Sequence, residues 1–176
     1  TQAVAVEKAR EALGAQWNKL VDKGRLSPEQ ASALKARLQS AAALADLAPC
    51  VLVVEAVVER LDVKKTLFGE LEDIVAPSAV LATNTSSLSV TAIAARLKRP
   101  RQFAGYHFFN PVPLMKVVEV IAGLKTSPDV CRQLADYARQ MGHTPVQAGD
   151  TPGFIVNHAG RGYGTEALRI VSEGVA

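Results

Sequence analysis

Short apolar runs alternate with helical segments through the middle of this 176-residue chain, and this alternation restricts its fold more than any other feature. The runs VLVVE at 51–55 and VLAT at 80–83 are typical of strands that are buried on both faces. Residues 61–74, between them, have the pattern of a helix. Parallel strands need such a crossover. The sequence therefore predicts an α/β fold with a mostly parallel sheet.

The same criteria locate the remaining elements. Apolar residues at helical spacing predict a helix over 3–23, which ends at Gly24. The segment Ser27-Pro28-Glu29-Gln30 has an N-cap serine, a proline at the first helical position and a glutamine that can complete a capping box. A second helix should therefore run to about Leu38. Further along the chain we expect helices over 91–97, 127–141 and 154–173 and strands over 103–108, 117–121 and 144–147.

The best candidate for a domain boundary is the break Asp150-Thr151-Pro152-Gly153, because the helix predicted after it has no strand following it. It divides the chain into an α/β part, residues 1–149, and a helical part, residues 150–176. No internal repeat or low-complexity tract interrupts either part.

Composition narrows the classes of protein. Apolar residues make up 48% and charged residues 21%, which are values typical of a globular domain. The net charge of +3 comes without a basic stripe, so a nucleic acid partner is not expected. Cys50 and Cys131 form no C-x-x-C pattern, which argues against a zinc site or a disulfide framework and favours a reducing cytosol. No apolar run approaches the roughly 18–20 residues of a membrane span, and the charged, helical start does not resemble a signal peptide.

A glycine-rich dinucleotide loop requires a preceding strand and a helix that begins at the phosphates. The only glycine-rich stretch is Gly160-Arg161-Gly162-Tyr163-Gly164, which falls in a predicted helix with no strand before it. We therefore interpret these glycines as small residues that permit close helix packing, and not as a phosphate-binding loop.

His107 and Glu119 are the first candidates for chemistry. They lie twelve residues apart in FAGYHFFNPVPLMKVVEVI, at 103–121, where two predicted strands flank an Asn-Pro turn. If the strands are neighbours, the carboxylate can fix the tautomer of the imidazole and raise the basicity of its other nitrogen, as a general base requires. The alternative is a structural histidine and an unrelated surface glutamate. On spacing alone, that alternative is favoured.

Polar residues 84–88, Asn-Thr-Ser-Ser-Leu, follow a predicted buried strand, at the position where parallel sheets bind ligands. The alternative is a helix N-cap, formed by Ser87 or Ser89, and on spacing alone it has the advantage. Asn110 can belong to a turn and Asn157 can lie near the start of a helix, so neither is specific by itself.

Taken together, these segments resemble those of a known enzyme family. ATNTSSL at 82–88, FAGYHFFNPVPLMKVVEVI at 103–121 and DTPGFIVN at 150–157 resemble the L-3-hydroxyacyl-CoA dehydrogenase family, and VVEAVVERLDVKKTLF at 53–68 matches the segment after that family's fourth strand. The resemblance covers nearly the whole chain at the family's order and spacing. It implies a partial Rossmann-type, doubly wound sheet in 1–149, followed by the first helix of an all-α C-terminal domain in 150–176.

The resemblance also implies roles for individual residues. The reaction would be the reversible, NAD-dependent oxidation of an L-3-hydroxyacyl-CoA to the 3-ketoacyl-CoA. His107 would be the general base and acid, Glu119 its orienting partner, and Ser86 and Asn157 the groups that bind the reacting oxygen. The positions that match cofactor contacts are Ala56, Glu59, Lys64, Ser86 and Asn110. Lys64 has a second interpretation, as a solvated charge at the start of a helix.

The resemblance implies a longer bacterial, cytoplasmic protein that binds acyl-CoA, needs no metal and forms a homodimer through its helical domain. The family's glycine-rich unit would precede this chain, so we expect the chain by itself to bind NAD weakly and to be inactive. His143 and His158 are not expected to be catalytic, and at His158 the family more often has arginine. Two alternatives stay open: a related dehydrogenase of a non-CoA hydroxy acid, of the L-gulonate type, and a non-catalytic interaction fragment.

Overall fold

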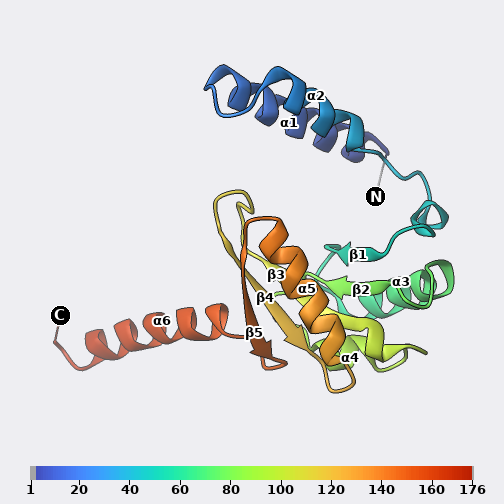
Figure 1. The fold of residues 1–176 in the computed structure, drawn as a ribbon. Helices are drawn as coiled ribbons and strands as arrows, with labels where there is room; N and C mark the ends of the chain where they lie inside the picture. The colour runs from blue at the N-terminus through green and yellow to red at the C-terminus, as the bar shows by residue number, and fades with distance from the viewer. Residues whose placement is uncertain (1–2, 176) are drawn as a thin grey trace. The chain divides into compact units, whose positions relative to one another are not determined.

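The computed structural model describes residues 3–175 and contains a five-stranded sheet in the order β1-β2-β3-β4-β5 (Figure 1). The strands are β1 (Leu52–Glu55), β2 (Val80–Thr83), β3 (Phe103–Phe108), β4 (Val117–Ala122) and β5 (Thr144–Gly149). Three of the four neighbouring pairs are parallel, and only β3 and β4 are antiparallel. The mostly parallel α/β sheet that the sequence predicts is confirmed.

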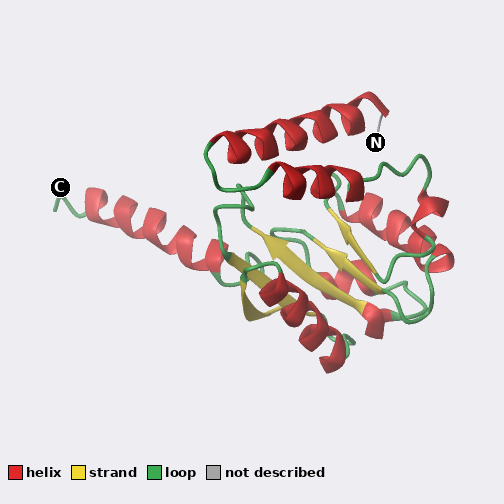
Figure 2. Cartoon of the chain, turned by 45° about the horizontal axis from the view of Figure 1, so that its top comes forward, coloured by secondary structure: helices red, strands yellow, loops and turns green. Residues whose placement is uncertain are grey.

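The helices, red in Figure 2, also follow the predicted order along the chain. They are α1 (Ala3–Asp22), α2 (Pro28–Arg37), α3 (Leu61–Ile74), α4 (Val90–Ala94), α5 (Pro128–Gln140) and α6 (Val156–Ser172), with short 3₁₀ helices η1 (Leu44–Leu47) and η2 (Pro100–Gln102). The capping box at the start of α2 is present, since Ser27 Oγ accepts from Gln30 N at 3.2 Å and Gln30 Oε1 accepts from Ser27 N at 2.9 Å. No helix in the described residues is long and apolar enough to cross a membrane.

The chain divides into two units, one ending at Leu47 and the other beginning at Ala48. The first contains α1, α2 and η1, and the second contains the sheet and the remaining helices. The candidate catalytic and cofactor-binding residues all lie in the second unit.

Helices cover both faces of the sheet. Alternate residues of a strand point to opposite faces, and in β3 this separates Tyr106, which packs with α5, from Phe103, whose ring meets Phe68 of α3 edge-on at 4.6 Å. Gly105 lies on the α4 face, where an added Cβ would come within 2.9 Å of Val90 Cγ2. The glycine therefore allows α4 to approach the sheet closely, on the same face as His107.

Two strand predictions need correction. The run at 51–55 is not buried on both faces, because Val51 and Val54 are 66% and 41% exposed. In the described residues β1 pairs only with β2 and is an edge strand, so fewer neighbours cover it. The last strand is two residues longer than predicted, because Ala148 and Gly149 continue their pairing with β4.

Helix α4 is also shorter than the predicted range of 91–97. The backbone N–H groups of Lys98 and Arg99 donate to the carboxylate of Glu72 on α3, at 2.7 and 2.5 Å. Pro100 follows directly and has no N–H to extend a helix. These contacts draw the chain away from the helical path after Ala94.

Candidate active site

The cross-strand register brings His107 and Glu119 together. They are directly opposed in the antiparallel pair β3–β4, so their side chains share one face of the sheet. His107 Nδ1 lies 2.7 Å from Glu119 Oε2, and the two residues are 4% and 0% exposed. The alternative of an unrelated surface glutamate is therefore wrong.

The second oxygen of Glu119 holds the start of α6. Glu119 Oε1 accepts from the backbone N–H groups of Ile155 and Val156, at 2.9 and 3.0 Å. A carboxylate at this position satisfies N–H groups that have no partner within the helix, and it interacts favourably with the positive end of the helix dipole. One buried carboxylate thus links β4, the candidate base and the first turn of α6.

His107 keeps one ring nitrogen available. A carboxylate accepts hydrogen bonds, so Nδ1 carries the proton and Nε2 of a neutral ring has a free lone pair. No protein group in residues 3–175 hydrogen-bonds Nε2. Among these residues the only buried polar side-chain atom without a partner is Nδ1 of His143, so Nε2 of His107 reaches the surface. The rings of Phe109 and Phe154 flank the imidazole, with centroids 4.6 and 5.6 Å away.

Ser86 and Asn157 also meet, although they are 71 residues apart. Asn157 Nδ2 donates to the backbone oxygen of Ser86 at 3.3 Å. Asn84, which was not singled out individually from the sequence, joins the ends of two strands, since its Oδ1 accepts from Phe108 N at 2.8 Å. Ser89 caps α4 by accepting from Ala92 N at 3.1 Å, so the capping alternative is confirmed for Ser89 and leaves Ser86 free.

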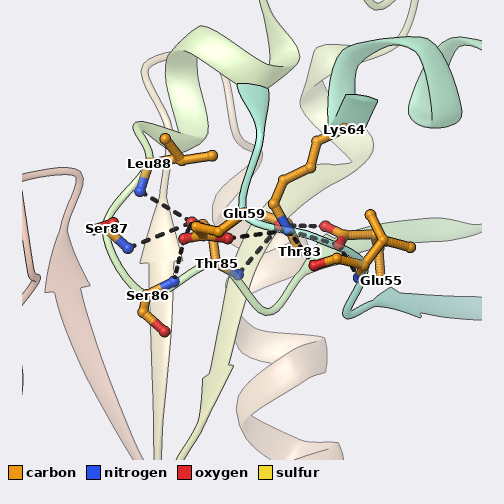
Figure 3. Close-up of polar contacts among 9 residues, drawn as sticks. Glu55, Glu59, Lys64, Thr83, Thr85, Ser86, Ser87 and Leu88 are labelled. Atoms are coloured by element: carbon orange, nitrogen blue, oxygen red, sulfur yellow. Dashed lines mark hydrogen bonds and ion pairs between the residues drawn. The ribbon is translucent and has the colours of Figure 1, made fainter. Parts of the chain in front are cut away.

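Lys64 belongs to a buried ionic cluster, and its interpretation as a solvated charge is wrong (Figure 3). Its side chain is 1% exposed, and Nζ lies 2.6 Å from Glu55 Oε1 and 3.2 Å from Glu59 Oε2. The other oxygen of Glu55 accepts from the hydroxyl of Thr83 at 2.7 Å. Charged groups are buried in this way only when they are paired and hydrogen-bonded.

Glu59 connects this cluster to the Ser86 loop. Its carboxylate accepts from the hydroxyl of Thr85 and from Ser86 N, the latter at 2.9 Å (Figure 3). Partial burial alone would raise the pKa of Glu59, but the bonds from Thr85, Ser86 and Lys64 together lower it below its ordinary value. Thr85 Oγ1 in turn accepts from Leu88 N at 3.0 Å.

Sequence reasoning missed Glu55 and Thr83, and it included Thr85 only as a member of the polar segment 84–88. A usable signal existed for Glu55, because a carboxylate that ends an apolar run is costly to bury without a partner.

The remaining cofactor candidates, Ala56 and Asn110, lie exposed just after β1 and β3. No hydrogen bond in the described residues connects the side chain of Asn110 to His107. The peptide bond from Asn110 to Pro111 is cis.

Asp150 is another residue that sequence reasoning did not assign to the site. Its carboxylate accepts from Val90 N, Thr91 N and the hydroxyl of Ser89, each at 2.8 Å. Burial would raise the pKa of Asp150, but these bonds, those from Thr91 foremost, outweigh it and lower the pKa. The predicted helix start at residue 154 is wrong, because Phe154 has a φ of 50° and α6 begins at Val156.

The other two histidines make separate contacts. The Nε2 atom of His143 lies 3.2 Å from Val112 O, and the Nδ1 atom of His158 lies 3.3 Å from Pro152 O. The glycines between 160 and 164 lie inside α6, as predicted. Within the described part of the chain, no group of three or more His, Cys, Asp or Glu side chains is arranged to hold a metal ion.

A mostly parallel sheet with helices on both faces, and polar groups gathered where strands β1 to β3 end, defines a Rossmann-like α/β domain. The family model described as "3-hydroxyacyl-CoA dehydrogenase, NAD binding domain" matches residues 1–151. The chain belongs to this family, and NAD is the cofactor of the domain.

Named proteins that are similar to this chain are consistent with the family assignment. The chain is 45% identical over 174 residues to 3-hydroxyadipyl-CoA dehydrogenase of Escherichia coli K12, and 45% identical over 158 residues to a probable 3-hydroxybutyryl-CoA dehydrogenase of Deinococcus radiodurans. These alignments cover 99% and 90% of this chain but only 37% and 56% of the relatives. A crystal structure of 3-hydroxybutyryl-CoA dehydrogenase from E. coli K12 matches with a TM-score of 0.96 and 44% identity, over 99% of this chain and 37% of that one.

Proposed function

We propose that this protein catalyses the reversible NAD-dependent oxidation of an L-3-hydroxyacyl-CoA to the 3-ketoacyl-CoA. The observation that carries the proposal is the buried His107–Glu119 pair, in which Nδ1 is held at 2.7 Å and Nε2 has no partner among the described residues. Such an arrangement suits a general base, which needs a fixed tautomer and one accessible nitrogen.

In this proposal His107 Nε2 takes the proton of the substrate 3-hydroxyl during oxidation and returns it during reduction. Glu119 keeps the imidazole in the tautomer that exposes Nε2, and its charge stabilises the imidazolium that forms. The bonds from Ile155 N and Val156 N keep the carboxylate from rotating away from the ring. A positioned base contributes about 10²–10⁴-fold to the rate.

Ser86 and Asn157 would bind the reacting oxygen of the substrate. Their support is the contact between Asn157 Nδ2 and Ser86 O, which places the two residues side by side. An alcohol develops negative charge on oxygen as it is oxidised, and donors that are already positioned lower the barrier to that change. The phenylalanine rings beside His107 help to exclude water from the same region.

The residues present fit the nicotinamide end of the cofactor. Glu59, whose side chain is 40% exposed, presents a fixed carboxylate next to the Ser86 loop, and the buried Lys64 would act by holding that carboxylate in place. The residues that would hold the cofactor are Ala56, Glu59, Lys64, Ser86 and Asn110. Bound NAD supplies the hydride acceptor.

The test is the oxidation of NADH by the full-length protein with acetoacetyl-CoA, alongside a series of free 3-keto and hydroxy acids. We expect turnover of the CoA thioester, and its loss in His107→Ala. The matched control is His143→Gln, at a buried histidine whose Nε2 lies 3.2 Å from Val112 O, because the glutamine Nε2 has a similar reach and can still donate to that oxygen. Turnover of the free acids alone would replace the CoA proposal with the hydroxy-acid alternative, and turnover of neither would contradict the dehydrogenase role.

The names of the relatives suggest substrates to compare first, namely 3-hydroxyadipyl-CoA and 3-hydroxybutyryl-CoA. We also propose a homodimer that uses the helical part from residue 150 onward. Its support is the exposure of apolar side chains along α6, where Tyr163, Leu168 and Val171 are 82%, 72% and 64% exposed. A cytoplasmic location and the boundary at 149–150 remain predictions.

A further inference from the structure

The segment 150–157 carries several of the contacts that orient the candidate active site. Its last residue, Asn157, donates to Ser86 O. Just before it, Ile155 N and Val156 N donate to Glu119. The ring of Phe154, which is 3% exposed, packs against His107. The position of this segment therefore decides where several of the groups that act on the substrate lie.

Asp150, the first residue of this segment, anchors it to another part of the chain. The carboxylate bonds to Ser89, Val90 and Thr91, which follow the Ser86 loop directly in the chain. Helix α4 does not depend on Asp150 for its cap, because Ser89 Oγ already accepts from Ala92 N. The three bonds therefore do more than cap the start of α4. They also attach the segment 150–157 to the residues that follow Ser86.

The backbone conformation in the middle of the segment 150–157 is unfavourable, so it needs contacts such as those of Asp150 to hold it. Gly153 has a φ of 80° and Phe154 a φ of 50°, a region that residues other than glycine rarely occupy. An added Cβ at Gly153 would lie 3.2 Å from His158 N. Conformations of this kind persist only where the surrounding structure holds them in place.

We propose that Asp150 is a positioning residue for the dehydrogenase reaction, because it fixes the segment that presents Asn157 to Ser86 and two N–H groups to Glu119. This inference rests on the proposed function. Within residues 3–175 no hydrogen bond or ion pair joins Asp150 to His107, so Asp150 acts through this segment. It couples two loops that are 60 residues apart in sequence, and both contribute groups to the same substrate oxygen in the proposed mechanism.

The test compares Asp150→Asn and Asp150→Ala with Glu72→Gln in the full-length protein. Glu72 is a matched control, because it is a buried carboxylate that also accepts two backbone N–H bonds but lies away from the site. We expect Asp150→Ala to lower kcat by about 10–10²-fold, since small misplacements of reacting groups have effects of that size. The kcat of Asp150→Asn should lie between that of Asp150→Ala and that of the unmodified protein, because an amide oxygen still accepts one of the N–H bonds. Glu72→Gln should lower stability and change kcat less than twofold.

Two readouts separate positioning from stability. The dissociation constant for NADH should stay within twofold in both Asp150 variants, and the acidic limb of the pH profile of kcat/KM should move. In proton NMR spectra, the hydrogen-bonded proton on His107 Nδ1 should shift or broaden in Asp150→Ala and stay unchanged in Glu72→Gln. A folded Asp150→Ala with unchanged kcat, pH profile and Nδ1 resonance would overturn the inference.

The resonance also keeps the two proposals distinguishable. If the unmodified protein turns over no hydroxyacyl-CoA, the proposed function fails, and the shift of the His107 resonance still decides whether Asp150 orients the pair. If Asp150→Ala does not fold, Asp150→Asn provides the same comparison with less disruption, and an unchanged resonance and pH profile in that variant would count against the inference.

Discussion

Two buried carboxylates lie in this sheet, and they are used differently. Glu55 is 4% exposed and binds Lys64, Thr83 and Val57 N, so both of its oxygens have protein partners. Glu119 is 0% exposed and binds His107 and the start of α6, but Nε2 of that histidine has no protein partner in the part of the chain that the structure describes. The comparison teaches that burial and pairing do not mark a catalytic group by themselves. The distinguishing feature is a partner with one hydrogen-bonding position left open to the substrate.

This difference predicts different consequences for the two clusters. Changes around Glu119 should affect the rate, with or without a loss of stability, and changes around Glu55 should affect chiefly the stability. Three predictions test that separation, beginning with the largest effect, and a fourth concerns stability in acid.

Replacement of His107 by alanine should lower kcat by about 10²–10⁴-fold, because the base is removed. Binding of NADH should change little, since the histidine belongs to the proton-transfer group and not to the Glu59–Lys64 cluster. Steady-state kinetics with acetoacetyl-CoA and a fluorescence titration with NADH measure the two effects. A variant with unaltered kcat would show that the open nitrogen has no catalytic role.

Replacement of Lys64 by methionine should lower the free energy of unfolding by about 3–5 kcal/mol, because Glu55 would stay buried without its counter-charge. The double variant Lys64→Met with Glu55→Gln should recover much of the loss, since the remaining carboxylate charge is then gone. Urea denaturation of the three proteins gives the comparison. If the single variant lost less than about 1 kcal/mol, the Glu55 cluster would not be a stabilising unit.

Replacement of Glu119 by glutamine should affect both properties moderately. An amide has one oxygen, so it can accept either from His107 or from α6, and the other set of donors loses its acceptor. We expect an effect of about 1–3 kcal/mol, which corresponds to roughly 10–10²-fold if it falls on the rate. Kinetics and urea denaturation on the same preparation show how it divides. An effect on stability alone would make Glu119 resemble Glu55.

The smallest expected effect is a loss of stability in acid. The pKa values of Asp150 and Glu59 are lowered in the folded protein from ordinary values of 3.8 and 4.5. The unfolded chain therefore binds protons first as the pH falls, so the stability from these groups is present above about 4.5 and is lost as the pH falls through the folded pKa values. Asp150→Asn should be less stable than the unmodified protein at pH 6, and the difference should shrink by pH 3. Urea denaturation at both pH values measures it; a difference that grows in acid would contradict the sign.

The elements whose patterns depend on local sequence could be predicted well. The runs at 80–83 and 103–108 and the helix at 61–74 match β2, β3 and α3, because continuous apolar runs and helical spacing report burial directly. The end of α4 could not be predicted, since it depends on Glu72, which is 26 residues away from Lys98. The exposure of β1 likewise depends on its neighbours and not on its own residues.

The same division applies to the candidate site. His107 and Glu119 could be selected from the sequence, but their contact depends on the strand register, which no local pattern gives. The bonds from Asp150 to α4 and from Glu119 to α6 join segments that are tens of residues apart. Such contacts follow from the tertiary fold, and Asp150 and the α6 contact of Glu119 were missed for this reason.

The shared carboxylate of Glu119 also has a thermodynamic consequence. One of its oxygens binds the imidazole of His107, and the other accepts two hydrogen bonds from the first turn of α6. A change in the strength of the bond to the ring alters the free energy of the contact with α6, and a displacement of that turn alters the bond to the ring by the same amount, since linkage is reciprocal. The orientation of the imidazole and the position of the first turn of α6 are therefore coupled through one side chain.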